Sequence, residues 1–526
     1  MKTDLGNEHR FIAEVDAFEF VAQDLGAILD SLNAWFERLC VDLQAHRLVS
    51  RGLTERSPLA RHADAINTLL RDAGPSWARQ WASLEPASAL ADHFDDKVLL
   101  LVFGKFNAGK SSLCNFLADR FAAHGKAVQY FHLDSGRIVE TSARLEEGTT
   151  ETTARLQGVR LGENLVLLDT PGLHSMTLEN AALTQRFTDS ADAVLWLTSS
   201  TSPGQVQELD DIARELHRNK PLLPVVTRSD AYDEDEIDGE IVKALRNKTA
   251  RNRALQEADV AARAAGKLVA MGVDAALLRT PVSLSVHVAR EQGQTPAALT
   301  EAGFDRLYGA LLAIGEPALA YKRRKCAEIL LHHLEENVLR TLLRDVLPLL
   351  DQMDEASRTA VDLLEQQREK IVAGIWRSVM PTLPELLERH AETRDVTAIR
   401  NGLSQSVLDA FAREANEHLA GYVVATDPAL ATITVADDAG YEDIVVARAA
   451  GSGHPDQVVG VDYRRLHGEL VQAVRDSLTS LASHAADQCR ASIGQLASQS
   501  DSLKQVLWTG ERELLDLKQR LRSGAA

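Results

Sequence analysis

The sequence is poor in cysteine, in aromatic residues and in uninterrupted apolar segments. Its four cysteines lie far apart and form no CxxC pair. This argues against a disulfide scaffold or a cysteine-bound metal and fits a reducing cytoplasm. No apolar run approaches the ~20 residues that cross a bilayer. The N-terminal residues carry charges of both signs without an apolar stretch, so we expect neither a signal peptide nor a transmembrane helix.

An excess of positive charge is also missing. The net charge of −19 over 526 residues argues against general binding of nucleic acid or anionic lipid. Two basic clusters, 246–253 and 322–325, are interpreted as solvated helix faces or domain junctions. Hydrophobic residues make up 45% of the chain and aromatic residues only 5%, a composition that favours a mostly helical protein.

Long amphipathic segments flank a central region of a different kind. Apolar residues recur at spacings of four and three from Phe11 to Leu43, which predicts one long helix packed against other helices. Similar seams follow residue 301. Between them, residues 96–300 alternate short apolar runs with helical segments, so we expect a doubly wound, mainly parallel sheet.

This pattern predicts three parts. Residues 1–95 form N-terminal helices that join a helical bundle, 96–300 form the α/β domain, and 301–526 form the rest of the bundle. A non-helical hairpin is expected within 421–464, with strands near Thr432–Val435 and Ile444–Val446.

The stretch 104–112 reads Gly-Lys-Phe-Asn-Ala-Gly-Lys-Ser-Ser and follows an apolar run that is typical of a buried strand. Strand, glycine loop, Lys-Ser and helix are the context of a phosphate-binding loop. Backbone N–H groups surround the β-phosphate there, and a lysine and the helix N-terminus add positive charge. The predicted nucleotide-binding residues of this loop are Gly104, Asn107, Ala108, Gly109, Lys110, Ser111 and Ser112.

A second motif, Asp169-Thr170-Pro171-Gly172, ends another apolar run. Asp169 is expected to hold a Mg²⁺-bound water, and the Gly172 N–H to meet the γ-phosphate. Thr150 lies 19 residues before Asp169, the spacing of the switch threonine in small GTPases. The predicted metal set is therefore Ser111, Thr150 and Asp169. Two neighbouring residues, Thr149 and Thr153, are the alternatives to Thr150.

The stretch Thr227-Arg228-Ser229-Asp230 matches the guanine-reading motif [N/T]-K-x-D except for arginine in place of lysine. Asp230 is expected to accept hydrogen bonds from guanine N1 and N2, which adenine does not offer. The aliphatic stem of Arg228 can still pack on the purine. Ser283 is the expected contact on the other side of the base. These motifs predict guanine nucleotide and Mg²⁺ as ligands.

The residue after Gly172 is Leu173, where Ras-type proteins carry the glutamine that positions water. We therefore expect a slow basal rate of GTP hydrolysis, which rises when another group completes the site. In GTPases with Asn-Ala-Gly-Lys-Ser loops, the asparagine ligates a monovalent cation. The expected catalytic residues are Lys110, Thr150 and Asn107, with K⁺ or Na⁺ as an additional cofactor.

Together these motifs resemble the dynamin superfamily, specifically the bacterial dynamin-like proteins. The resemblance implies a GTPase domain between helices that form a neck and stalk. It also implies self-association through the GTPase domain and, in many members, membrane remodelling. The expected hairpin at 421–464 is acidic, unlike an apolar membrane paddle. The alternatives are a regulatory switch GTPase and a nucleotide-controlled interaction scaffold. We expect a cytoplasmic protein and leave peripheral membrane contact, a secretion or vesicle role and a protein partner open.

Overall fold

The computed structural model describes residues 6–17, 25–91, 94, 96–105, 107–134, 137–147, 156–169, 188–202, 205–237, 240–446 and 457–523. The chain forms two compact units. Unit 1 comprises Met1–Ala34, Ala78–Glu335 and Leu514–Ala526, and unit 2 comprises Trp35–Trp77 and Glu336–Glu513. The expected architecture, an α/β domain within a mostly helical chain, is confirmed.

Unit 1 contains an eight-stranded sheet with the order β10-β7-β6-β1-β5-β4-β2-β3. The five strands from β10 to β5 pair in parallel, and β4, β2 and β3 continue the sheet in antiparallel pairings. The sheet is mainly parallel, as predicted. The strands are β1 (Val98–Phe103), β2 (Val128–Asp134), β3 (Arg137–Thr141), β4 (Gln157–Leu161), β5 (Leu165–Asp169), β6 (Ala193–Ser199), β7 (Leu222–Thr227) and β10 (Val282–Ser283).

Both faces of the parallel part of this sheet are buried, which explains why β1 is apolar at every position. Leu100 and Val102 belong to one core cluster, and Leu99 and Leu101 to the other. This alternation follows from the two-residue period of a strand. The helices of this unit include α4 (Lys110–Ala123), α6 (Ala213–His217), α7 (Ala250–Ala270), α8 (Val286–Glu291), α9 (Pro296–Glu301) and α10 (Phe304–His333), with short turns η3 (Val206–Ile212) and η4 (Ala275–Leu277).

The first helix corrects one expectation. The seam from Phe11 to Leu43 predicted one continuous helix, but α1 (Asn7–Asp16) ends at its C-cap, Ala17. Its apolar face lies in the core of the sheet domain, where the Phe11 ring packs edge-on against Phe121 with centroids 6.1 Å apart. Glu8 fixes the helix through a hydrogen bond from Arg120 Nε at 2.6 Å. Periodicity identified the buried face but not the element that covers it.

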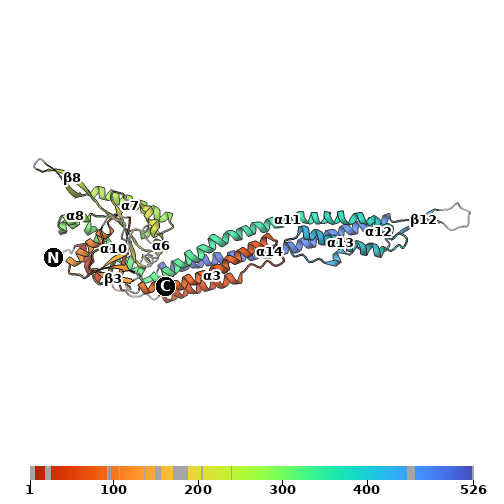
Figure 1. The fold of residues 1–526 in the computed structure, drawn as a ribbon, viewed down its shortest axis with the longest axis horizontal. Helices are drawn as coiled ribbons and strands as arrows, with labels where there is room; N and C mark the ends of the chain where they lie inside the picture. The colour runs from red at the N-terminus through yellow and green to blue at the C-terminus, as the bar shows by residue number, and fades with distance from the viewer. Residues whose placement is uncertain are drawn as a thin grey trace. The chain divides into compact units, whose positions relative to one another are not determined.

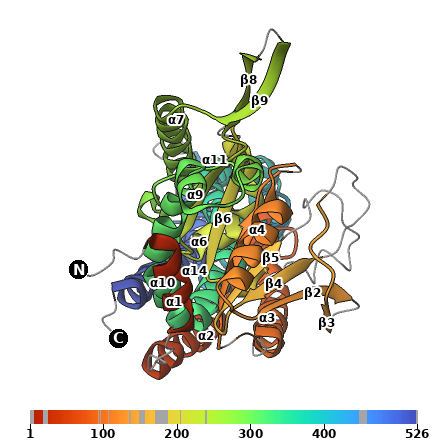
Figure 2. The same ribbon diagram turned by 90° about the vertical axis from the view of Figure 1, so that its left-hand side faces the viewer.

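A hairpin that the sequence analysis did not predict follows the base-reading motif. It consists of β8 (Asp230–Ile237) and β9 (Glu240–Asn247), which pair only with each other among the described strands. Figure 2 shows the two strands extending away from the sheet. The missed signal was Asp-Gly at positions 238–239, a favoured hairpin turn between strand-like runs.

Long helices dominate unit 2. In Figure 1, α11, α13 and α14 run side by side. The helices wholly or partly in this unit are α2 (Gly26–Ala45), α3 (Pro58–Ala91), α11 (Leu347–Val379), α12 (Leu383–Arg389), α13 (Val396–His418) and α14 (Arg464–Ser523). They are accompanied by the π-helical segments η5 (Leu334–Leu339) and η6 (Leu342–Val346) and by the short 3₁₀ helices η7 (Met380–Thr382) and η8 (Pro428–Ala431).

Unit 2 is held by a leucine-rich core and by a few buried polar contacts. The Trp35 side chain is 1% exposed and donates its indole N–H to the Gly510 carbonyl at 3.0 Å. The Lys504 ammonium lies 2.5 Å from an Asp351 oxygen and 2.6 Å from an Asp354 oxygen. These contacts join α2 and α11 to α14, which explains the apolar seams in all three segments.

A hairpin within 421–464 is present, and the expected strand at Ile444–Val446 lies within it, but its partner differs from the one expected. β11 (Glu442–Val446) pairs with β12 (Gln457–Asp462), whereas Thr432–Val435 forms no strand. The expected loop at 451–455 lies outside the described residues.

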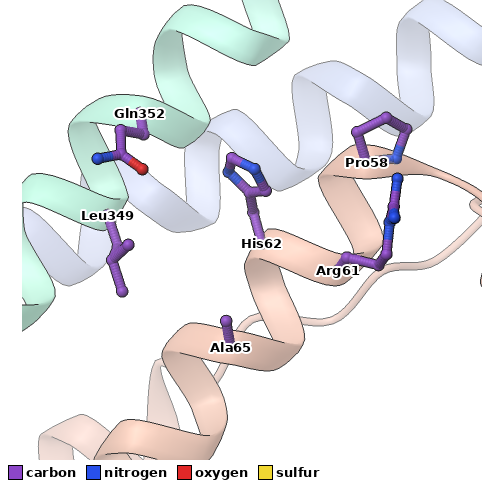
Figure 3. Close-up of a pocket in the computed structure, with 6 residues that line it drawn as sticks. All are labelled: Pro58, Arg61, His62, Ala65, Leu349 and Gln352. Atoms are coloured by element: carbon purple, nitrogen blue, oxygen red, sulfur yellow. The ribbon is translucent and has the colours of Figure 1, made fainter.

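The described part of unit 2 also has an open groove of about 410 Å³ between α3 and α11 (Figure 3). Arg61 and His62 line it beside Leu349 and Gln352. None of its lining residues belongs to a predicted nucleotide motif. Among the described residues, every helix is too short or too polar to cross a bilayer.

Replacing Trp35 by alanine should destabilise unit 2, because it removes a fully buried ring and the indole hydrogen bond. We expect a loss of about 3–5 kcal/mol in the free energy of unfolding. Trp508, which lies on α14 and is 42% exposed, is the matched control. Its replacement by alanine should cost no more than about 0.5 kcal/mol. Chemical denaturation followed by circular dichroism measures both, and equal losses would contradict the packing described.

Candidate nucleotide-binding site

The loop between β1 and α4 has a backbone that only particular residues allow. A Cβ atom on Gly104 would lie 2.2 Å from the Leu197 carbonyl oxygen of β6, so any other residue would displace a strand. Gly109 has φ +85° and directly precedes α4. Asn107 adopts φ +62°, which asparagine tolerates better than most residues. The predicted phosphate loop therefore has the left-handed turns that its sequence implies.

The side chain of Lys110 lies across this loop. Its Nζ donates to the Gly104 carbonyl at 2.9 Å and to the Lys105 carbonyl at 3.1 Å. Burial lowers the pKa of Lys110, while the nearby Asp169 carboxylate opposes that shift. A phosphate placed in the loop would exchange two carbonyl partners for a full negative charge, a stronger acceptor.

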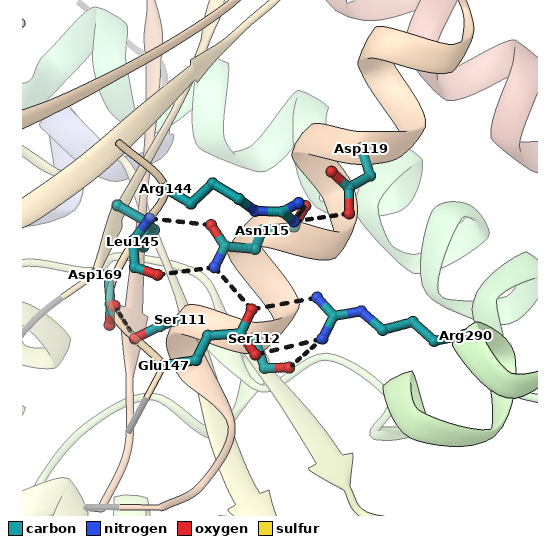
Figure 4. Close-up of polar contacts among 9 residues, drawn as sticks. All are labelled: Ser111, Ser112, Asn115, Asp119, Arg144, Leu145, Glu147, Asp169 and Arg290. Atoms are coloured by element: carbon teal, nitrogen blue, oxygen red, sulfur yellow. Dashed lines mark hydrogen bonds and ion pairs between the residues drawn. The ribbon is translucent and has the colours of Figure 1, made fainter. Parts of the chain in front are cut away.

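Ser111 and Asp169 meet as predicted. The Ser111 hydroxyl donates to Asp169 Oδ2 at 2.5 Å (Figure 4). Gln157 Nε2 donates to the same oxygen at 2.9 Å. Asp169 is 3% exposed, and burial raises the pKa of its carboxyl group. One carboxylate beside one hydroxyl suits Mg²⁺, which takes few protein ligands and completes its shell with phosphates and water. Gln157 was not predicted.

Thr227, the last residue of β7, supports the phosphate loop. Its hydroxyl donates to the Ala108 carbonyl at 2.7 Å, and its side chain is buried. Ala108 is itself 3% exposed. The contact joins the end of β7 to the phosphate loop, a supporting role that the motif alone does not reveal.

A buried carboxylate that the sequence analysis missed also supports the loop. Glu208 of η3 accepts the Lys105 backbone N–H at 3.2 Å and the Trp196 indole N–H at 3.3 Å. Burial raises the pKa of Glu208. No local motif marks this residue, because its role depends on how η3 packs beside β6.

Where the guanine base is expected to bind, the structure corrects the predicted contact, Ser283. Ser283 is fully buried, and both its N–H and its hydroxyl donate to Glu257 Oε1, at 2.8 and 2.5 Å. It therefore faces the core, and Ser285 instead donates its hydroxyl to the Asp230 carboxylate. Side chains alternate along an extended segment, so both serines leave the same face, but Glu257 occupies the space beside Ser283. Arg228 has φ +51° and is exposed.

The structure thus brings together much of the predicted set. Lys110, Ser111 and Asp169 form one cluster, and Asp230 with Ser285 forms another. Ser112 lies in the first turn of α4, within 3.4 Å of Arg290. Thr150 and Gly172 lie outside the described residues, as do Thr149, Thr153 and Leu173.

Comparison with known proteins agrees with this geometry. Residues 100–228 match the family described as 50S ribosome-binding GTPase. The uncharacterized protein ACIAD1444 of Acinetobacter baylyi is 43% identical over 517 residues, which cover 98% of this chain and 99% of that protein.

Among solved structures, LeoA, a bacterial dynamin GTPase from ETEC, is 13% identical with a TM-score of 0.29, covering 99% of this chain and 98% of LeoA. Elongation factor SelB from Methanococcus maripaludis is 12% identical with a TM-score of 0.22 over 42% of this chain. The chain spans about a third of the length of SelB (34%).

The motifs, the sheet and the family match over residues 100–228 define a P-loop GTPase domain within a mostly helical chain. The chain belongs to the same family as ACIAD1444 of Acinetobacter baylyi.

Replacing Asp169 by asparagine tests the metal cluster. An ionised carboxylate in this buried position is unfavourable without a cation, as its raised pKa indicates. A raised carboxyl pKa lowers stability as pH rises through it, so at neutral pH the nucleotide-free variant should unfold no more easily than the wild type. Its affinity for Mg²⁺ with a GTP analogue should fall about 10- to 100-fold. Scanning calorimetry measures the stability of the nucleotide-free proteins, and titration calorimetry of the GTP analogue with and without EDTA measures the magnesium dependence of binding. An unchanged magnesium dependence would contradict the assignment.

Proposed function

We propose that this protein binds GTP with Mg²⁺ and hydrolyses it to GDP and phosphate. The observation that supports this is the placement of two clusters at the carboxyl ends of parallel strands. The phosphate cluster, Lys110 with Ser111 and Asp169, follows β1 and ends β5. The base cluster, Asp230 with Ser285, follows β7 and β10. Open α/β sheets bind their ligands at this edge.

Each residue has a proposed role. Lys110 neutralises phosphate charge, and Asp230 reads guanine while the stem of Arg228 covers the purine. Mg²⁺, when bound, neutralises the charge that develops on the β- and γ-phosphates. Its proposed ligands are Ser111, Thr150 and Asp169. The remaining contacts are proposed for the N–H groups of Gly104, Asn107, Ala108, Gly109, Ser112 and Gly172.

We further propose that two GTPase domains associate when GTP is bound and that this raises a slow basal rate. Leu173 offers no group to position water, so another contribution is needed. We propose that a K⁺ or Na⁺ ion ligated by Asn107 makes this contribution to catalysis. The long helices would convert association into a conformational change. A switch GTPase assisted by a separate activator is the alternative outcome of the tests below.

The proposed compartment is the cytoplasm. All four cysteines are free thiols, as a reducing compartment favours. We also propose peripheral contact with a membrane, with membrane remodelling or a role in secretion or vesicle traffic. Co-sedimentation with liposomes, with and without a GTP analogue, separates them from a purely soluble function.

Replacing Asp230 by asparagine should exchange guanine for xanthine specificity, since the amide donates where the carboxylate accepts. GTP affinity should fall at least about tenfold, and xanthosine triphosphate should bind more tightly than it does to the wild type. Lys110→Ala is the control, because it should weaken both nucleotides. Competition against a fluorescent nucleotide measures the affinities. Equal binding of ATP and GTP by the wild type would refute the base-reading assignment.

Turnover should rise with protein concentration and be faster in potassium or sodium chloride than in a bulky organic cation. Asn107→Ala should abolish the cation effect and leave GDP affinity within about threefold, because the ion lies beside the transferred phosphate. Phosphate release measured across a wide range of protein concentration is the assay. A specific activity that is independent of concentration and cation would favour the activated switch.

A further inference from the structure

Arg290 of α8 lies at the edge of the phosphate loop in a contact that no predicted motif includes. Its guanidinium donates to both oxygens of Glu147, at 3.2 and 3.3 Å, and lies 3.4 Å from the Ser112 hydroxyl. Figure 4 shows the side chain extending from α8 toward the first turn of α4. A forked contact of this kind is a geometry that arginine makes with carboxylates and phosphates.

The chain path places this guanidinium between the two proposed ends of the nucleotide. Ser285, which contacts Asp230 at the base end, is the N-cap of α8. Arg290 lies in the last turn of the same helix and reaches Ser112, two residues after Lys110. The part of a guanine nucleotide between its base and its β-phosphate is the ribose and the α-phosphate.

We infer that Arg290 is a ligand for the α-phosphate of the bound nucleotide, held in position by Glu147. The inference rests on the proposed binding of guanine nucleotides and names one further contact of that site. The α-phosphate is common to GTP, GDP and GMP, so Arg290 contributes to binding and not to discrimination between the substrate and its product.

Glu147 is fixed independently of Arg290. Asn115, which is 1% exposed, donates to Glu147 Oε1 at 2.7 Å and exchanges two hydrogen bonds with the backbone of Leu145. Burial alone would raise the pKa of Glu147, but hydrogen bonds from Arg290, Asn115 and Ser112 keep it lowered. The hydrogen bond from Asn115 therefore positions the carboxylate, which in turn orients the guanidinium of Arg290.

This arrangement has an electrostatic consequence. A carboxylate beside a phosphate repels it, and Arg290 compensates for that repulsion as well as offering donors of its own. Guanidinium has five N–H donors, so it can keep its contact with Glu147 while donating to a phosphate oxygen. The two effects, direct donation and compensation of Glu147, are separable by mutation.

The test uses the full chain and competition of GMP and guanosine against a fluorescent GDP. The variants are Arg290→Gln, Glu147→Gln and the double variant, with Glu291→Gln as the matched control. Glu291 lies next to Arg290 on α8, is 53% exposed and pairs with His287. Guanosine lacks the phosphate, so the ratio of its affinity to that of GMP isolates the contribution of the α-phosphate.

In Arg290→Gln we expect GMP affinity to fall about tenfold while guanosine affinity is unchanged. The double variant should recover only the part of the loss that the uncompensated Glu147 carboxylate causes and should still bind GMP more weakly than the wild type, and Glu291→Gln should behave as the wild type. Recovery of wild-type GMP affinity in the double variant would overturn the inference, because Arg290 would then only compensate Glu147. An equal loss for guanosine would also overturn it, since Arg290 would then support the base loop. If no guanine ligand displaces the fluorescent GDP from the wild type, the proposed function itself fails.

Discussion

The parallel register of β1, β5, β6 and β7 is the constraint on which the site depends. Val102 lies opposite Asp169, and the last residues of β6 and β7, Ser199 and Thr227, are paired. All of these strands therefore end at one edge of the sheet. A slip of one residue in β5 would turn Asp169 to the opposite face and separate it from Ser111. Apolar runs that are buried on both faces make such a slip costly, so hydrophobic packing fixes the polar geometry.

The same edge concentrates ionisable groups that burial disfavours. Burial raises the pKa of Asp169 and of Glu208, and lowers that of Lys110. Asp169 and Glu208 accept hydrogen bonds from nearby groups, and Lys110 donates to backbone carbonyls, so the charged side chains are positioned without a ligand. In the proposed function a magnesium nucleotide would supply the charges that these groups lack, and Lys110 would exchange its two carbonyl partners for a phosphate.

The sequence analysis predicted position correctly where consecutive residues set it. The phosphate loop, Asp169 and Asp230 are read from local motifs, and the structure places them at one edge. It failed where a role is set by a partner distant in the chain. Ser283 and Ser285 are equivalent in sequence, and only Glu257 decides which of them reaches Asp230. The seam of α1 likewise predicted a buried face without identifying the sheet domain as its partner.

The opposite end of β1 shows how firmly α10 is attached to the sheet. Asp192 is fully buried, accepts the Leu99 N–H at 2.9 Å and lies 2.5 Å from Lys325 Nζ of α10. Lys322, one turn earlier, donates to the Lys97 carbonyl at 2.6 Å. Breaking such a buried pair leaves an uncompensated charge and costs about 3–5 kcal/mol. The phosphate loop and α10 are thus fixed to the two ends of one strand, and α10 should follow the sheet as a single body.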